Sequence, residues 1–408
     1  MMIFILGFLF LLNCAGIAAD PAAENFYYSD TVTEATQKFA NACNHSNGTI
    51  EYINHPELGA NNESLKVAVC SVGNASSDAV VLTISGTHGI EGYAGSMAQI
   101  SMLRGPSSMF PPSLRMVHIH MINPYGASHV LKENEQNADQ LKNEAGYYAL
   151  DYDNPIVHEL MDGIDWPNLA TEQAQQNAIT LYTQLIVKYG LENVNAALKT
   201  GQGKRPQGIA YFGPSKSWST TTLEYILNKY VGKVSRILLL DWHTAVGPHG
   251  VWSFMAVDQQ SESIFKRWAP TAATLVYDLG LPTGGVLPYS RLRTMTGAKK
   301  VIRGLWEAGT EEVTIQTNSM FILRLYCRFY STPTDPFCQA IIAQTRQFFY
   351  PQLTSWKNMT YHGINKILPS VLAGFAAESN KAIVTLVSMT IVIVTTTISL
   401  LLQKEWSI

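Results

Sequence analysis

The feature that most constrains the fold of this chain is a set of short, nearly continuous apolar runs. They occur at Ala79–Ser85, Met116–Ile122, Arg236–Asp241 and Val301–Trp306. Continuous apolar runs of this length are typical of parallel strands that are covered on both faces. Helical patterns lie between them, most clearly at Thr171–Tyr189 and Thr221–Tyr230. The sequence therefore predicts an α/β fold in which crossover helices join the strands of one sheet.

The length and composition bound the number of domains and the classes of partner. The chain has 408 residues, of which 47% are hydrophobic and 14% charged, and this balance argues against a mainly disordered protein. Its formal net charge is -3 and it has no basic tract, so we expect no nucleic-acid partner. We predict one domain over residues 20–352, with a loop at Ser331–Pro336 before a last helix at Phe337–Phe349, and then a stalk over 353–381.

The first 19 residues have the pattern of a secretory signal peptide. An apolar run is followed by the small residues Gly16, Ala18 and Ala19, although no basic residue precedes the run. An N-terminal membrane anchor is the alternative, but the run is short for a span. We expect cleavage near Ala18 or Ala19.

An uncharged apolar stretch near the C-terminus predicts a single transmembrane helix at 382–402, with a short cytosolic tail at 403–408. Its 21 residues match the roughly 20 that cross a bilayer as a helix. A buried core helix would be expected to carry polar residues on one face. A GPI signal is the other alternative, but the chain ends with Gln403, Lys404 and Glu405 before Trp-Ser-Ile rather than with an apolar tail. We expect the domain to lie outside the cytosol, in the secretory pathway.

Cysteines and glycosylation triplets agree with that location. Beyond the signal peptide there are Cys43, Cys70, Cys327 and Cys338, and Cys43–Cys70 with Cys327–Cys338 is the simplest of three possible disulfide pairings. Asn-x-Ser/Thr triplets begin at Asn44, Asn47, Asn62, Asn74 and Asn358. The cluster of four near the N-terminus is typical of an exposed, glycosylated region.

Two of the predicted strands lead into segments that carry histidine. The first segment reads Ser-Gly-Thr-His-Gly-Ile-Glu-Gly at residues 85–92, and the second reads Asp-Trp-His-Thr at residues 241–244. Because ligands gather at the carboxyl ends of parallel strands, His88, Glu91 and His243 can converge on one ion. Two imidazoles and one carboxylate leave zinc an open position for water, which is the arrangement of a catalytic site.

These segments resemble the zinc carboxypeptidase clan, which includes aspartoacylase and succinylglutamate desuccinylase relatives. The resemblance covers roughly residues 30–352, and it includes Asn-Pro-Tyr-Gly at 123–126 and Gly-Pro-x-x-x-Trp-Ser at 213–219. It implies a mixed, largely parallel central sheet with helices on both faces, and one zinc ion on His88, Glu91 and His243. It also implies a general base at Glu307, in the segment Glu-Ala-Gly-Thr, with Glu311 and Glu312 nearby in the sequence.

The resemblance implies roles for residues 139–143 as well. Asp139 corresponds to the carboxylate that orients a metal-bound histidine through its second ring nitrogen. The Asn-Arg pair that follows in the clan, and that holds a substrate carboxylate, is replaced here by Leu141-Lys142. Lysine lacks the planar fork of arginine, so we assign only a weak substrate-binding role to Lys142 and Asn143, and we do not carry over carboxypeptidase specificity.

Two functions fit the sequence. The first is zinc-dependent hydrolysis of an amide bond in a peptide or an N-acyl amino acid, outside the cytosol. The second is a membrane-tethered binding protein of the same fold without turnover, which the loss of the Asn-Arg pair suggests. The chain has no Gly-x-Ser-x-Gly elbow of a serine hydrolase and no phosphate-binding loop of a nucleotide enzyme.

Overall fold

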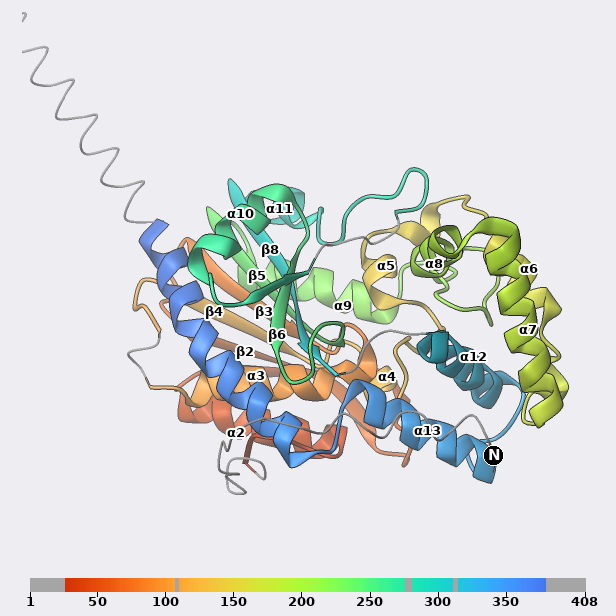
Figure 1. Cartoon of the computed structure of the whole chain (residues 1–408). Helices are drawn as coiled ribbons and strands as arrows, with labels where there is room; N and C mark the ends of the chain where they lie inside the picture. The colour runs from red at the N-terminus through yellow and green to blue at the C-terminus, as the bar shows by residue number, and fades with distance from the viewer. Residues whose placement is uncertain (1–25, 107–109, 276–280, 311–314, 379–408) are drawn as a thin grey trace, which may run out of the picture.

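The described residues form one mixed sheet with helices on both faces, as Figure 1 shows. The computed structural model describes residues 26–106, 110–275, 281–310 and 315–378. In this part of the chain the sheet has eight strands in the order β1-β2-β4-β3-β5-β8-β6-β7. Their bounds are β1 Thr49–Leu58, β2 Ser64–Gly73, β3 Ala79–Ser85, β4 Arg115–His120, β5 Arg236–Ala245, β6 Trp252–Ala256, β7 Ala273–Leu275 and β8 Lys300–Gly309.

The parallel centre of the sheet consists of the four strands that the sequence predicts. β4 pairs with β3, β3 with β5 and β5 with β8, all in parallel. β2 pairs antiparallel with both β1 and β4, and β6 pairs antiparallel with β8. The prediction of a mixed, largely parallel sheet is therefore confirmed. The sequence did not indicate β1, β2, β6 and β7, because their apolar patterns are short or alternate.

The helices connect and cover these strands. Among the described residues they are α2 Val32–His45, η1 Gly89–Glu91, α3 Gly92–Arg104, α4 Pro124–Ser128, α5 Gln140–Glu144, η3 Tyr147–Ala149, α6 Pro155–Gly163, η4 Trp166–Asn168, α7 Glu172–Tyr189, α8 Leu191–Thr200, α9 Trp218–Ile226, η5 Leu227–Val231, α10 Gln259–Trp268, α11 Leu292–Thr296, α12 Ile315–Phe329 and α13 Pro336–Phe349. The predicted helix at Thr171–Tyr189 is α7. It begins after Thr171, whose hydroxyl accepts from the Ala174 N–H, and it ends at Gly190, where φ is +86°.

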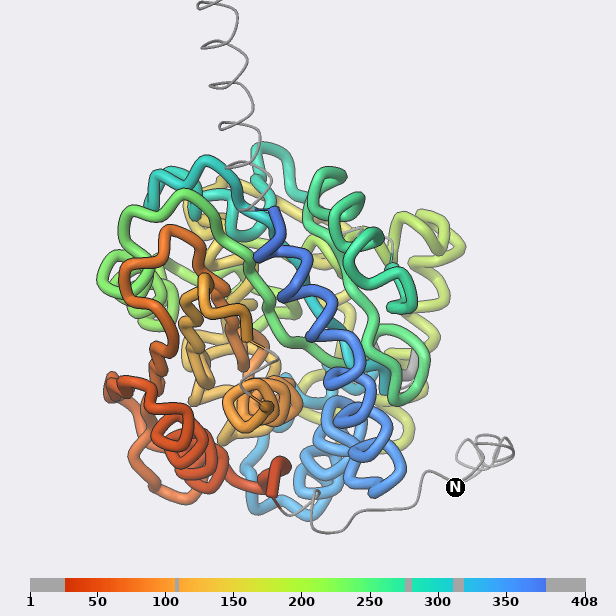
Figure 2. Tube along the Cα trace, turned by 90° about the vertical axis from the view of Figure 1, so that its left-hand side faces the viewer, coloured from red at the N-terminus to blue at the C-terminus, as the bar shows by residue number. Residues whose placement is uncertain are grey.

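Two separate apolar cores lie on the two faces of the sheet. One face packs against α3, α10 and a helix over residues 354–378, around the buried Trp242, Trp252 and Trp306. The other face packs against α9, η5 and α11. Figure 2 shows α2, α3 and the helix over 354–378 lying along the same side of the molecule. The predicted strands are thus covered on both faces, which explains their continuous apolar pattern.

A helical lobe forms a third core beside the sheet. It consists of α6, α7 and α8 together with α12 and α13, which are distant in sequence (Figure 1). The Cys327–Cys338 disulfide joins α12 to α13, and Cys43–Cys70 joins α2 to β2. Both predicted pairings are therefore confirmed.

The predicted stalk over 353–381 is wrong for most of its length. Residues 354–378 form a helix that packs on the sheet, and Ile364, Leu368 and Phe375 on one side of it are fully buried. The Trp356 indole donates to the Gly309 carbonyl at 2.8 Å and ties this helix to the end of β8. Each such apolar side chain contributes roughly 1.5–3 kcal/mol when buried, so the helix belongs to the domain. Its apolar residues recur every three to four positions, the period of a helix with one buried side.

The predicted signal peptide at 1–19 and the predicted span at 382–402 lie outside the described residues. Within the described part of the chain, none of the helices has the length and apolar character needed to cross a membrane. Among the glycosylation triplets, Asn44, Asn47, Asn62 and Asn74 are exposed. Asn358 is only 6% exposed on the packed helix, so the structure does not support a glycan at this position.

Candidate metal centre

The glycines after β3 shape the segment that holds His88 and Glu91. Gly86 has φ +72°, a conformation that other residues rarely adopt. A Cβ atom on Gly89 would lie 2.2 Å from the Gly126 carbonyl carbon, so only glycine fits there. The backbone thus turns sharply at the end of β3 and directs His88 and Glu91 back toward the sheet. This geometry explains the Ser-Gly-Thr-His-Gly-x-Glu-Gly pattern.

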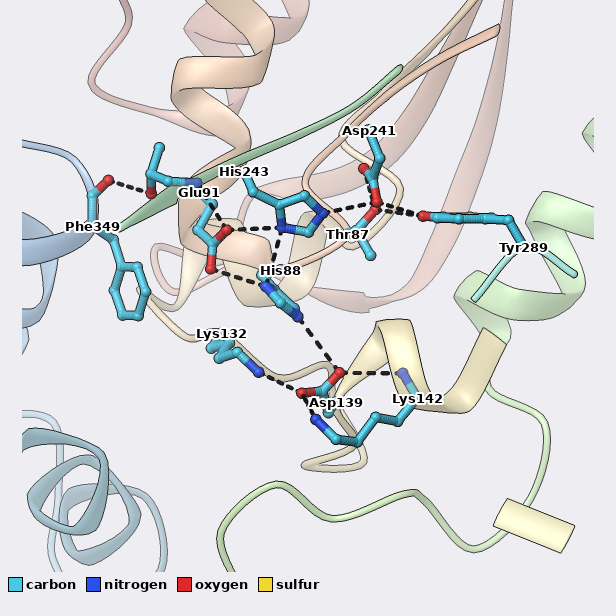
Figure 3. Close-up of polar contacts among 11 residues, drawn as sticks. Thr87, His88, Glu91, Lys132, Asp139, Lys142, Asp241, His243, Tyr289 and Phe349 are labelled. Carbon is cyan, nitrogen blue, oxygen red and sulfur yellow. Dashed lines mark hydrogen bonds and ion pairs between the residues drawn. The ribbon is translucent and has the colours of Figure 1, made fainter. Parts of the chain in front are cut away.

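His243 joins them from the neighbouring strand. β5 runs parallel to β3, with Ser85 opposite Trp242, so His243 stands just beyond the end of β3. Its Nδ1 lies 3.2 Å from His88 Nδ1 and 3.0 Å from Glu91 Oε2, and His88 Nδ1 lies 3.0 Å from Glu91 Oε1 (Figure 3). The structure therefore brings together the three side chains that the sequence singles out as ligands.

The spacing of these atoms fits one zinc-sized ion. Two ligand atoms held ~2.0–2.1 Å from a zinc ion at a tetrahedral angle lie ~3.3 Å apart. The observed separations of 3.0–3.2 Å are close to that value, and three ligand atoms, one from each residue, lie within 4.8 Å of one another. Burial alone would raise the pKa of Glu91, but the adjacent His88 and His243 lower it to about 2, so this ligand is ionised.

The second nitrogen of His88 faces Asp139, as the resemblance implies. His88 Nε2 lies 3.5 Å from Asp139 Oδ1. Asp139 also pairs with the ammonium groups of Lys132 and Lys142, and its Oδ1 accepts from the Lys142 backbone N–H at 3.2 Å, which begins α5. The buried Asp139 is therefore held in place from several sides, and it fixes the orientation of the His88 ring.

The second nitrogen of His243 is held by a carboxylate to which the sequence analysis gave no role. His243 Nε2 lies 2.8 Å from Asp241 Oδ2, and both side chains are almost fully buried. Asp241 also accepts from the Thr87 hydroxyl at 2.8 Å and from the Tyr289 hydroxyl at 2.6 Å. The signal was present in the Asp-x-His pattern, because residues two apart in a strand point to the same face.

Replacing Asp241 by Asn is expected to weaken zinc binding about 10- to 100-fold, because the amide no longer accepts a charge-assisted hydrogen bond from the His243 ring. The measurement is zinc affinity by competition with a chelator. Asp153→Asn, at an exposed carboxylate away from the site, is the matched control. Unchanged zinc affinity in Asp241→Asn would show that the hydrogen bond between Asp241 and His243 does not contribute to metal binding.

Glu307 lies beside His243 on the next strand. The two residues are register partners in the parallel pair β5–β8, so their side chains point to the same face of the sheet. Burial raises the pKa of Glu307 to about 8, against the lowering effect of His243. Within the described part of the chain, Glu307 Oε2 is buried and has no hydrogen-bond partner. Such a carboxyl group next to a ligand cluster is available to exchange a proton with a bound molecule.

A family model matches residues 28–362 and is described as "Protein of unknown function (DUF2817)". The chain belongs to the DUF2817 family. The match includes all three candidate ligand residues, Glu307 and the first part of the helix over 354–378. No curated protein matches this DUF2817 chain.

Solved structures similar to the DUF2817 chain come from the two groups that its motifs resemble. Carboxypeptidase A from Helicoverpa armigera is 9% identical, with a TM-score of 0.39, and the match covers 85% of this chain and 75% of that one. A metallo-carboxypeptidase from Burkholderia cenocepacia is 10% identical, with a TM-score of 0.38 and coverages of 86% and 71%. A succinylglutamate desuccinylase from a Silicibacter species is 12% identical, with a TM-score of 0.31 and coverages of 69% and 67%. Because these sequence identities and TM-scores are low, we infer the chemistry from the side chains of the site and not from these structures.

The two predicted substrate-binding residues of the DUF2817 protein are engaged within the fold. Lys142 Nζ lies 2.8 Å from Asp139 Oδ2, and its side chain is 10% exposed. Asn143 is fully buried. It donates to the carbonyls of Phe212 and Ser215 and accepts from the Ser217 N–H and the Thr220 hydroxyl. Asn143 therefore anchors the Gly-Pro-x-x-x-Trp-Ser segment. Its substrate-binding role stays a prediction, and both polar atoms of its side chain are already engaged in these hydrogen bonds.

A buried acid outside the cluster gives the DUF2817 protein a pH-dependent stability. Glu144 Oε2 accepts from the Tyr289 N–H at 2.7 Å, and burial raises the pKa of this carboxyl to about 7. A pKa raised in the folded state contributes stability that is complete below the unfolded pKa and is lost as the pH rises toward 7. We expect Glu144→Gln to be more stable than the wild type above pH 7, by at most about 3 kcal/mol, and equal to it near pH 4. Urea unfolding at several pH values tests this, and a constant difference across the range would contradict it.

Proposed function

We propose that this protein is a zinc-dependent hydrolase of amide bonds, acting on a peptide or an N-acyl amino acid. The convergence of His88, Glu91 and His243 within 4.8 Å carries the proposal. A carboxylate faces the second nitrogen of each histidine, which is how proteins orient metal-bound imidazoles. A purely structural cluster would not need beside it the buried Glu307 carboxyl group, whose Oε2 has no hydrogen-bond partner among the described residues.

A zinc ion on these ligands would polarise a water molecule or the substrate carbonyl. Beside a bound cation, Glu307 would be held in the ionised form that a base requires. Glu307 then takes the proton of the attacking water and delivers it to the leaving amine. The Thr244 N–H donates to Glu91 Oε2 at 3.1 Å and keeps that ligand in position.

The first experiment measures the metal content of the purified full-length protein by elemental analysis, and then its hydrolysis of a panel of peptides and N-acyl amino acids. About one zinc per chain, with hydrolysis that a chelator abolishes and added zinc restores, is the expected result. Zinc without hydrolysis of any compound would favour the alternative function, a membrane-tethered binding protein of the same fold. The ion pair of Lys142 with Asp139 favours this alternative, because Lys142 is then not free to hold a substrate carboxylate. A folded protein without metal would contradict the zinc hydrolase and would also favour the binding protein, which does not require the ion.

We also propose that the domain lies outside the cytosol, in the secretory pathway, held by a single transmembrane helix at 382–402. Two disulfides suit an oxidising compartment, and the triplets at Asn44, Asn47, Asn62 and Asn74 are exposed. Expression in a secretory host should give a protein whose apparent mass falls on glycosidase treatment. An unchanged mass would contradict glycosylation at these positions.

A further inference from the structure

A basic hollow lies between α12, α13 and the segment over residues 130–137. Its volume is about 370 Å³, which includes space that is open to solvent. The hollow is narrow, because the centre of a water molecule fits in only about 10 Å³ of it. Lys132, Arg324 and Arg328 lie in its wall, and Glu133 is the one acidic residue there. The lining of this hollow, which we call the α12 hollow, thus carries an excess of positive charge.

Among the described residues, the two arginines of the α12 hollow form no ion pair within 4.0 Å, and both share the charge of Glu133 in the same wall. Arg324 donates to the carbonyls of His129 and Val130, and Arg328 to those of Asn134 and Glu135. Arg324 is only 8% exposed, and its Nε is buried without a hydrogen-bond acceptor in the described part of the chain. One carboxylate, that of Glu133, does not balance two guanidinium groups, so the hollow favours an anion that adds a negative charge and an acceptor for Arg324 Nε.

Two residues in the wall of the α12 hollow are linked to the candidate metal ligands through one intervening residue each. Lys132, in its wall, pairs with Asp139, which faces His88. Phe349, also in its wall, accepts at its carbonyl from the Thr244 hydroxyl at 2.6 Å, next to His243. Figure 3 shows Lys132 and Phe349 beside the pair formed by His88 and Glu91. The wall of the hollow is thus close to the candidate ligands, and the substrate that we propose spans this distance between its amide bond and a neighbouring group.

We propose that the α12 hollow is an anion subsite that binds a carboxylate of the substrate, with Arg324 and Arg328 as the residues that determine specificity. This inference rests on the proposed function. It assigns anion recognition to α12, about 180 residues beyond the Leu141-Lys142 pair that replaces Asn-Arg. A carboxylate suits the narrow hollow because the carboxylate group is flat, and because its two oxygens can accept from two N–H groups of one guanidinium group.

The test is calorimetric titration of the full-length, zinc-loaded protein with succinate and, as the uncharged counterpart, succinamide. We expect saturable binding of succinate and at least tenfold weaker binding of succinamide. Arg324→Gln and Arg328→Gln should each weaken succinate binding at least tenfold, with zinc content unchanged. Arg293→Gln, at an exposed arginine in α11, should bind succinate like the wild type.

Equal binding of succinate and succinamide by the wild type would overturn the subsite, as would wild-type affinity in both glutamine variants. Because both arginines hold backbone carbonyls, a glutamine variant can fail to fold; Arg324→Lys and Arg328→Lys then replace it. The lysine variants keep the positive charge but lose the planar pair of N–H donors, so we expect succinate to bind at least threefold more weakly. Wild-type affinity for succinate in both lysine variants would overturn the proposal. Zinc content and hydrolysis are read separately: a zinc-loaded, active enzyme that ignores succinate contradicts only the subsite, whereas absent zinc contradicts the proposed function.

Discussion

Replacing Glu307 by Gln is expected to lower kcat for amide hydrolysis by about 10²- to 10⁴-fold while the protein keeps its zinc. The substitution preserves the size of the side chain and removes only the ability to accept a proton. Because Glu307 stands beside His243 without being one of the three converging ligands, the metal affinity should change little. Steady-state kinetics and zinc content of the same preparations test this, with KM expected to stay within a few-fold of the wild type.

Glu262→Gln provides the matched control, since Glu262 is a surface residue of α10 that pairs with Lys266. Its kinetics should equal those of the wild type. Full activity in Glu307→Gln would move the role of base to Glu311 or Glu312, which lie outside the described residues, or would contradict the mechanism. A loss of zinc in Glu307→Gln would instead make Glu307 a ligand, a role that we do not assign to it.

Replacing His243 by Ala, alone or with His88→Ala, is expected to abolish stoichiometric zinc and all zinc-dependent hydrolysis. The single variant leaves one imidazole and one carboxylate, too few ligands for a stable zinc site. It also leaves the buried Asp241 without the imidazole that faces it, so the variant should melt at a lower temperature. Elemental analysis and thermal unfolding of purified protein test both effects.

His249→Ala is the control for this pair. His249 lies six residues beyond His243, is exposed, and is not one of the three converging ligands. It should bind one zinc per chain, like the wild type. Stoichiometric zinc in the folded His88→Ala/His243→Ala protein would place the metal elsewhere and contradict the site. Folded His249→Ala without zinc would show that the predicted ligand set is incomplete.

The sequence predicts much of this fold because the central strands carry their burial in consecutive residues. The predicted strand at Ala79–Ser85 has the bounds of β3, and all seven of its residues are buried. The antiparallel strand β1, Thr49–Leu58, was not predicted, because only one of its residues is buried and its apolar signal is weak. The sequence does not distinguish the helix over 354–378 from a stalk, because the sheet on which its apolar side packs is distant in the sequence.

In the candidate site, too, some residues are marked by a local sequence pattern and others are not. His88 and Glu91 share one short glycine-rich segment, so their proximity is encoded locally, and His243 follows a second apolar run of the same kind. Tyr289 is different: its hydroxyl reaches Asp241 and Thr87 from a residue with φ +56°, and no local pattern marks it. Arg324 and Arg328 recur four residues apart like the charges of an ordinary surface helix, and their sequence context does not show that Arg324 is buried and Arg328 partly buried.

The sequence by itself therefore determined the parallel centre of the sheet and marked the three candidate ligands, while it left the disulfide pairing as the simplest of three. The strands and the histidine-bearing segments depend on apolar runs and compact motifs, which neighbouring residues are enough to specify. Only the tertiary structure decided that Asp241 faces His243, which side of α12 meets the segment over 130–137, and that residues 354–378 complete the core. These features depend on contacts between segments up to about 330 residues apart, and such contacts follow from how the whole chain packs rather than from any local pattern.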